Sequence, residues 1–159
     1  MLTTLCTCAL ICTLKVQCNV PKPFIREDIM IITHECEKYN ISDEDLELIY
    51  RCVMSEAGGE SDVCQEAVAT VILNRFFSPK FPDKISEIIV PGQFSTSDNG
   101  AVTSDVIRSV HRAIAEYDTP SMIVPYTCYY FRADYYHDFG IPYFHIDNTY
   151  FSLSEEATD

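Results

Sequence analysis

Two helical patterns meet at a Gly-Gly pair, and this corner limits the folds open to the chain more than any other feature. Before Gly58-Gly59, apolar residues recur at the i, i+3, i+4, i+7 spacing of an amphipathic helix. These residues are Leu46, Ile49, Tyr50 and Val53. Ser42, with Asp45 three residues later, predicts the N-cap of that helix. The two glycines predict its end, with glycine in the left-handed C-cap conformation.

A second helix is expected directly after the corner. Ser61 or Asp62 can cap its N-terminus, and the helix should run to about Phe77, before Pro79. The amphipathic spacing recurs in its apolar residues, which are Cys64, Ala67, Val68 and Val71. The chain therefore turns sharply between two helices, with an acidic residue on each side of the turn.

The remaining elements are expected from similar local patterns. Further helical segments are predicted at residues 24–39, 85–90 and 104–117. Short aromatic-rich segments at residues 127–131, 143–145 and 150–151 are typical of strands. A helical half followed by a small extended half is an α+β pattern.

The length of 159 residues fits one compact domain, which we place at residues 21–153. Residues 1–20 are a candidate secretion signal or anchor. Their apolar run is too short to span a membrane comfortably, and no Lys or Arg precedes Lys15 as the positive region of a signal peptide. A buried or frayed N-terminal arm remains the alternative. Residues 154–159 are expected to form an acidic tail.

Cysteine usage leaves the redox compartment open. Four of the eight cysteines crowd the N-terminal segment. The others form an even set that could make disulfides, with a pairing that the sequence does not fix. They are Cys36, Cys52, Cys64 and Cys128.

The formal net charge of −13 argues against nucleic acid as a partner, because phosphate binding needs a basic patch. It is compatible with a largely neutral glycan. We expect a monomer with no stable membrane span and no cofactor.

The two acidic residues at the corner should differ in protonation. Glu56 lies in the last turn of its helix, where the negative end of the helix dipole and partial burial both raise a carboxyl pKa. Glu60 precedes the next helix, whose positive end favours a carboxylate. One protonated and one ionised carboxyl is the pattern of acid/base sites. On spacing alone, however, acidic residues at helix ends are more often solvated surface.

Several blocks of sequence around this corner occur in a recognisable order. They are Glu56-Ala57-Gly58-Gly59-Glu60, residues 65–75 (QEAVATVILNR), residues 82–85 (PDKI) and Gln93-Phe94-Ser95. In this order they resemble the cell wall hydrolase family of the SleB type, the spore-cortex-lytic enzymes and their phage and bacterial relatives. The resemblance covers about residues 46–151.

The resemblance implies a lysozyme-like α+β fold that acts on peptidoglycan glycan strands outside the cytoplasm or at the cell wall. It implies that Glu56 is the catalytic acid. Gln93 and Ser95 match the turn that faces the groove in such folds, where they contact sugar or stabilise the turn. Glu60 and Tyr130 complete the candidate substrate-binding residues, Glu60 with a structural role at the corner as its alternative.

The C-terminal half departs from the family pattern. Tyr130-Phe131-Arg132 stands where the family often has Y-F-H, and Thr149 stands where its closing motif has a histidine. These departures do not touch Glu56, but they leave no role to copy onto this end of the chain. The tyrosines there either line a sugar groove or pack within strands. They are Tyr126, Tyr129, Tyr130, Tyr135, Tyr136 and Tyr143.

Several reactions remain open. A lytic transglycosylase needs one carboxyl as acid and then base, and we favour it because a single acid stands out. A muramidase-type hydrolase would use a second carboxylate, for which Glu60, Asp98 and Asp105 are candidates. A metal-dependent amidase or peptidase would need the loose His/Asp cluster near the C-terminus, although HExxH is absent. The cluster comprises Asp134, His137, Asp138, His145 and Asp147. A non-catalytic glycan-binding relative is the last alternative.

Overall fold

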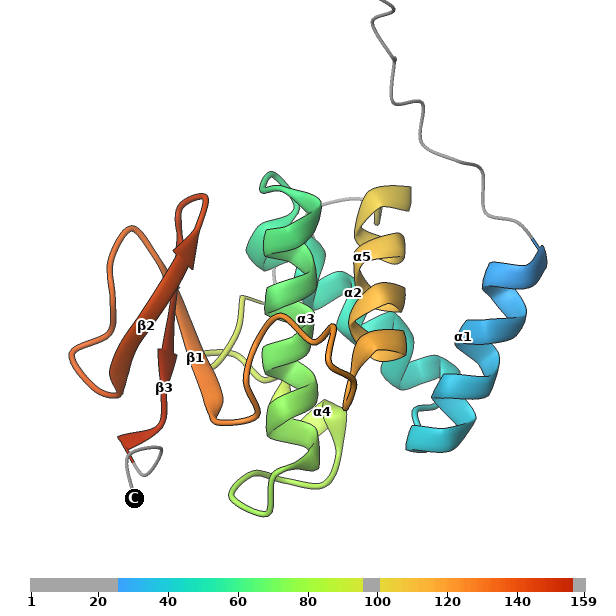
Figure 1. Ribbon diagram of the computed structural model, residues 1–159, viewed down its shortest axis with the longest axis horizontal. Helices are drawn as coiled ribbons and strands as arrows, with labels where there is room; N and C mark the ends of the chain where they lie inside the picture. Colours follow the sequence, from blue (N-terminus) through green and yellow to red (C-terminus); the bar gives the residue numbers. More distant parts are fainter. Residues whose placement is uncertain (1–25, 96–100, 156–159) are drawn as a thin grey trace, which may run out of the picture.

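The computed structural model describes residues 26–95 and 101–155. Five helices come first: α1 Arg26–Tyr39, α2 Asp43–Ala57, α3 Asp62–Phe77, α4 Ile85–Ile88 and α5 Ser104–Glu116. Three strands follow: β1 Cys128–Ala133, β2 Ile141–Ile146 and β3 Thr149–Leu153. Figure 1 shows the sheet on one side of α3, with the other helices on the opposite side and α1 outermost. The α+β expectation, with a helical half before a small sheet, is confirmed.

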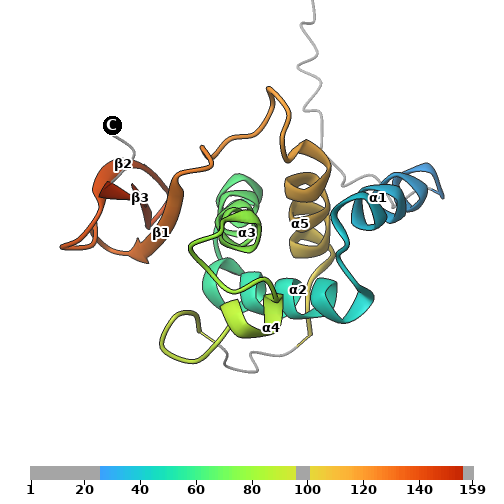
Figure 2. The same ribbon diagram turned by 90° about the horizontal axis from the view of Figure 1, so that it is seen from below.

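α3 is the central helix of the fold. Every residue from Cys64 to Arg75 is buried. The amphipathic pattern predicted for this helix is therefore wrong. It is packed against α2, α4 and α5 on one side and against β1 on the other, as the end-on view of Figure 2 shows. A helix that is covered on all sides has no need of a polar face, and small residues such as Ala67 and Ala69 let its neighbours approach closely.

The predicted N-caps of α2 and α3 are confirmed. Ser42 and Asp45 form a reciprocal capping box at the start of α2. The Ser42 hydroxyl accepts the Asp45 N–H at 3.1 Å, and the Asp45 carboxylate accepts the Ser42 N–H at 3.2 Å. Ser61 caps α3, because its hydroxyl accepts the N–H of Cys64 at 3.3 Å.

The predicted left-handed glycine at the end of α2 is wrong. Gly58 has φ −62° and ψ −21°, and its N–H still donates to the Met54 carbonyl at 3.1 Å. The chain then turns through a bond from the Glu60 N–H to the Ala57 carbonyl, at 3.0 Å. The corner is thus formed with helical backbone angles at Gly58. Among the described residues, the glycines that have a positive φ are Gly92 and Gly140.

The three strands form an antiparallel sheet in the order β1-β3-β2. Phe131 and Phe144 both pair with Phe151 of the central strand, so three rings form one row across the sheet. Phe144 stacks on Phe151 with 4.8 Å between the ring centroids. Phe131 also contacts Phe94, at 5.8 Å. This row joins the sheet to the turn that carries Gln93 and Ser95.

Side chains of α3 hold β1 in place. The Asn74 amide donates to the carbonyls of Pro125, at 2.9 Å, and Cys128, at 3.0 Å. Beyond β3, the Ser154 N–H donates to the Thr127 carbonyl at 2.8 Å, and Ser154 is buried. The first residue of the expected tail therefore belongs to the folded part. The expected signal or anchor segment and residues 156–159 lie outside the described residues.

The four cysteines of the described part are free thiols, so none of the disulfides considered from the sequence is formed among them. Cys52, Cys64 and Cys128 are buried. Burial raises the pKa of Cys64 to about 11 and that of Cys128 to about 12, which keeps both thiols protonated at neutral pH. Within residues 26–95 and 101–155, no helix combines the length and apolar character needed to cross a bilayer.

Replacing Asn74 tests the attachment of the sheet to α3. In Asn74→Ala two carbonyls lose their donor in a buried place, which should lower the free energy of unfolding by about 2–3 kcal/mol. The matched control is Asn148→Ala, whose amide bonds Asp134 at an exposed position and which should cost less than about 0.5 kcal/mol. Denaturant unfolding measures the free energy of unfolding of both variants. Equal losses would contradict the role of Asn74 in attaching the sheet to α3.

Candidate active site

Glu56 lies half-buried in the last turn of α2, facing the turn that follows α4. Its Oε1 atom accepts the backbone N–H of Ser95. The hydroxyls of Ser55 and Ser95 lie 2.8 Å apart and form a second bond between the same two segments. The predicted Gln93-Phe94-Ser95 turn is therefore in direct contact with the predicted acid.

The pKa of Glu56 is raised above its ordinary value. Burial is the largest cause, and the Ser95 N–H and the positive charge of Arg75 oppose it. The sequence pointed to the helix dipole first, and the last turn of α2 indeed contains no basic residue that would offset it. A carboxyl with a raised pKa keeps its proton closer to neutral pH, which is what a general acid requires.

Arg75 brings a buried positive charge to this site from α3, and only 6% of the residue is exposed. Its Nε atom donates to the Tyr129 carbonyl at 2.8 Å, and Nη1 donates to the Gln93 side-chain oxygen at 3.3 Å. The guanidinium carbon lies 4.7 Å from the ring centroid of Phe94. Burial lowers the pKa of Arg75, and the charge of Glu56 opposes this shift. The positive charge of Arg75 in turn favours the ionised state of Glu56.

Sequence reasoning did not select Arg75 as a site residue. The signal was its place at the end of residues 65–75, the longest of the blocks that carried the family resemblance. Tyr130, which was selected, has its ring 5.9 Å from the same guanidinium. The structure therefore brings Gln93 and Tyr130 to Arg75, whose charge acts on Glu56, and Glu56 in turn accepts the Ser95 N–H.

The other predicted acids have different surroundings. Glu60 contributes its backbone to the corner: its N–H bonds Ala57, and its carbonyl accepts the Gln65 amide at 3.1 Å. Asp105 forms an ion pair with Arg108 on α5. Asp98 lies outside the described residues.

The His/Asp cluster of the sequence is dispersed by the fold. Asp147 accepts the N–H and hydroxyl of Ser61, at 2.9 and 2.5 Å, and these bonds lower its pKa. His137 bonds the Phe131 carbonyl at 3.0 Å, whereas His145 stacks on Tyr150. In the part of the chain that the structure describes, no three His, Cys, Asp or Glu residues lie together as a metal site would require.

Fold and sequence together place the protein in a class. The chain belongs to the cell wall hydrolase family, whose model matches residues 59–152. The match begins three residues after Glu56, so Glu56 lies just outside the matched part.

Individual relatives are spore cortex-lytic enzymes. The enzyme of Halalkalibacterium halodurans is 41% identical over 76 residues, which are 47% of this chain and 23% of that protein. The enzyme of Bacillus subtilis is 33% identical over 76 residues, 47% of this chain and 25% of that protein. The aligned part thus spans about a quarter of the length of these curated relatives.

Solved structures of SleB catalytic domains share the fold. The domain from Bacillus cereus aligns with a TM-score of 0.57 and 26% identity, over 70% of this chain and 91% of that chain. The domain of the germination-specific lytic transglycosylase SleB from Bacillus anthracis aligns with a TM-score of 0.56 and 25% identity, over 70% of this chain and 95% of that chain.

The two corner glycines should respond differently to alanine. A Cβ at Gly58 would lie against the Met54 carbonyl and 2.9 Å from the Met54 sulfur, whereas a Cβ at Gly59 meets no atom within 4 Å. Neither glycine has a positive φ. Gly58→Ala should therefore cost about 1–3 kcal/mol through overpacking. Gly59→Ala should change stability by less than about 1 kcal/mol. Thermal and denaturant unfolding measure the stability of both variants. A Gly58→Ala protein as stable as the wild type would refute the close packing of Gly58 against Met54.

Glu56 should weaken the fold at neutral pH. Because its folded pKa is raised, the folded state binds more protons than the unfolded state between the two pKa values, so stability falls as pH rises through that window. Glu56→Gln removes the charge and keeps an acceptor for the Ser95 N–H. Its melting temperature should match the wild type at pH 4 or below and exceed it by a few degrees at pH 7–8.

The control for that comparison is Glu47→Gln, on the same helix, where an exposed carboxylate pairs with Arg51 at 2.8 Å. Loss of an exposed pair should change stability by less than about 1 kcal/mol. A Glu56→Gln protein that is less stable than the wild type at pH 8 would contradict the inferred cost of burying this acid.

Proposed function

We propose that this protein cleaves the glycan strands of peptidoglycan at the bond between N-acetylmuramic acid and N-acetylglucosamine, with Glu56 as the catalytic acid. The observation that carries the proposal is the half-buried carboxyl of Glu56, whose pKa is raised by burial and which accepts one backbone N–H beside a buried arginine. Membership of the cell wall hydrolase family supports the substrate class. The action would take place outside the cytoplasm, at the cell wall, where this substrate lies.

In the first step Glu56 donates its proton to the glycosidic oxygen, and the bond from that oxygen to the muramyl C1 breaks. The carboxylate that remains is stabilised by the Ser95 N–H and by the charge of Arg75. In the second step this carboxylate removes the proton of the muramyl C6 hydroxyl, whose oxygen attacks C1. The products are a 1,6-anhydromuramyl end and a free N-acetylglucosamine end, and Glu56 is protonated again.

One carboxyl is sufficient for this sequence, and Glu56 supplies it. Among the described residues, the groups that shift the pKa of Glu56 are Ser95 and Arg75, and no carboxylate is among them. Asp105 is engaged with Arg108. A hydrolase that activates water would place a second carboxylate across the bond. The name of the Bacillus anthracis relative, a lytic transglycosylase, agrees with the same choice. We further propose that the protein acts as a monomer.

Glu56→Gln tests the acid. Purified peptidoglycan is digested with wild-type and variant protein, and released fragments are quantified and identified by mass spectrometry. The variant should lose about 10²–10⁴-fold in rate, the usual contribution of a general acid. Glu60→Gln, at the other side of the same corner, should retain most of the activity, because Glu60 contributes backbone bonds there.

The products decide the reaction. Anhydromuramyl ends in the wild-type digest support the transglycosylase, and reducing muramyl ends without them would replace it by hydrolysis. Full activity of Glu56→Gln would overturn the assignment of the acid itself.

A further inference from the structure

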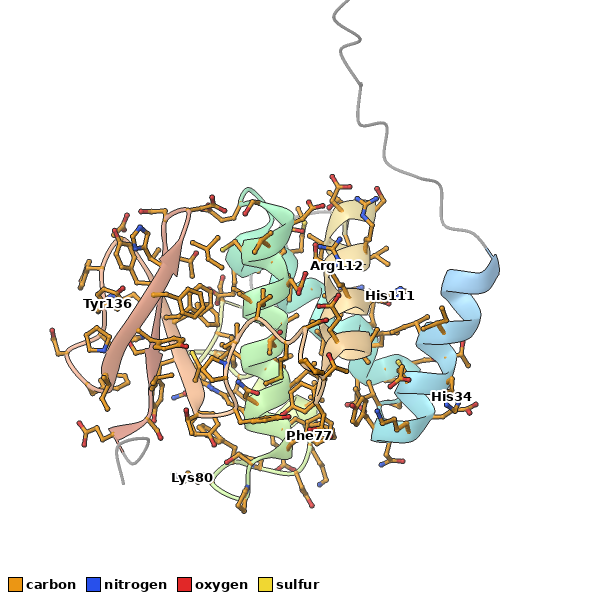
Figure 3. The ribbon with its side chains drawn as sticks, in the orientation of Figure 1. His34, Phe77, Lys80, His111, Arg112 and Tyr136 are labelled. Atoms are coloured by element: carbon orange, nitrogen blue, oxygen red, sulfur yellow. The ribbon has the colours of Figure 1, made fainter. Side chains whose placement is uncertain are left out.

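A groove of about 490 Å³ opens between the sheet and the segment that follows α3. Four of its lining residues are aromatic: Phe81, Tyr129, Tyr130 and Phe139. The others are Lys80, Gly140, Ser154 and Glu155. Figure 3 shows Lys80 at the foot of α3, on the side that faces the sheet. The groove is distinct from the contacts of Glu56, since Glu56 is not one of its lining residues.

The rings of the groove are held in place by other rings. Phe139 is 51% exposed and stands edge-on to Tyr130, with centroids 5.1 Å apart and planes at 89°. His137 stacks behind Phe139 at 4.5 Å. Among the other lining rings, Phe81 lies 5.1 Å from Tyr129 between centroids. An exposed ring that is already fixed loses little conformational freedom when a ligand covers it.

Gly140 lets the Phe139 wall lie close to the sheet. Its φ is +80°, a backbone angle that residues other than glycine rarely adopt. A Cβ at this position would lie 2.7 Å from the Leu153 carbonyl and 3.3 Å from the Tyr130 ring. Glycine here therefore sets the distance between Phe139 and Tyr130, and with it the width of the groove.

The composition of the lining indicates what the groove can take. It contains one lysine and one glutamate, so its formal charge is zero in a protein of net charge −13. Tyrosine hydroxyls and Ser154 add hydrogen-bonding groups beside the aromatic faces. A mostly aromatic concave site with a few polar groups fits a neutral ring that carries hydroxyls and an amide. A peptide with several carboxylates would find no excess of positive charge.

The groove is linked to the Glu56 site through the contacts of Arg75. Phe81 and Tyr130 line the groove, and both also flank the guanidinium of Arg75, at 5.2 and 5.9 Å. Arg75 in turn acts on Glu56. The groove and the Glu56 site therefore lie beside the same buried residue, within the reach of one extended glycan strand.

We infer that the groove is a distal sugar site, which binds an N-acetylhexosamine ring of the glycan strand away from the bond that is cut, chiefly by stacking on Phe139. This deepens the proposed function and rests on it for the identity of the strand. The site adds binding energy for long strands that short fragments cannot use, so the protein cleaves long strands more efficiently than short ones.

Binding is measured first, without catalysis, by titrating the protein with linear N-acetylglucosamine oligomers of two and six sugars. Phe139→Ala should weaken binding of the hexamer about tenfold, which corresponds to about 1.4 kcal/mol, and leave the dimer within twofold. Phe139→Trp keeps a stacking face and should restore hexamer binding. The matched control is Tyr143→Ala, an equally exposed ring (53%) on β2 that does not line the groove. It should change neither affinity.

Cleavage is measured next, on glycan strands from which the peptides have been removed, sorted by length. Phe139→Ala should lower kcat/KM about tenfold on long strands and within twofold on tetrasaccharides, with a melting temperature close to that of Tyr143→Ala. Equal losses for both lengths, or no rescue by Trp, would overturn the distal site while leaving Glu56 as the acid. Length-dependent binding in a protein that releases no fragments would retain the sugar site and refute the proposed function.

Discussion

The buried guanidinium of Arg75 is the interaction on which the rest of the site depends. A positive charge removed from water costs several kcal/mol unless it is paired and hydrogen-bonded. Arg75 meets this requirement with groups from separate segments: the Tyr129 carbonyl at the sheet, the Gln93 side chain in the turn after α4, and the rings of Phe94 and Phe81. Displacing any of these segments would leave the charge with fewer partners. The cation therefore fixes the position of the sheet and of the turn relative to α3.

The same cation limits how far the pKa of Glu56 can rise. Burial alone raises the pKa of the carboxyl, and a carboxyl that keeps its proton could act as an acid but not as the base of the proposed second step. Arg75 and the Ser95 N–H lower the pKa against that trend, yet the net shift remains upward. Burial favours the protonated form of Glu56, whereas Arg75 and the Ser95 N–H favour the ionised form. Since the net pKa shift is upward, ionised Glu56 lowers the stability of the fold at neutral pH.

Local features of the fold could be predicted from the sequence, because they depend on residues a few positions apart. The Ser42–Asp45 capping box, the Ser61 cap and the short helix near Ile85 are of this kind. Burial of α3 on all sides could not be predicted, since it depends on how distant elements pack around it. The same holds for Arg75, whose partners lie 18 and 54 residues further along the chain. The geometry of Gly58 was also missed, because glycine allows several ways to end a helix and Met54 packing selects among them.

The C-terminal sheet, where the sequence departs from the family pattern, is attached to α3 near both ends of that helix. Asp147, in the turn between β2 and β3, accepts two bonds from Ser61 at the start of α3. Near the other end of α3, Asn74 and Arg75 bond the carbonyls of β1. The sheet is therefore fastened to α3 at two places, and Figure 1 shows it alongside that helix. Two attachments along one rigid helix prevent the sheet from pivoting. Since Tyr130 belongs to the sheet and Arg75 to the helix, the two attachments set the 5.9 Å separation between the Tyr130 ring and the guanidinium, although Thr149 stands in place of the family's closing histidine.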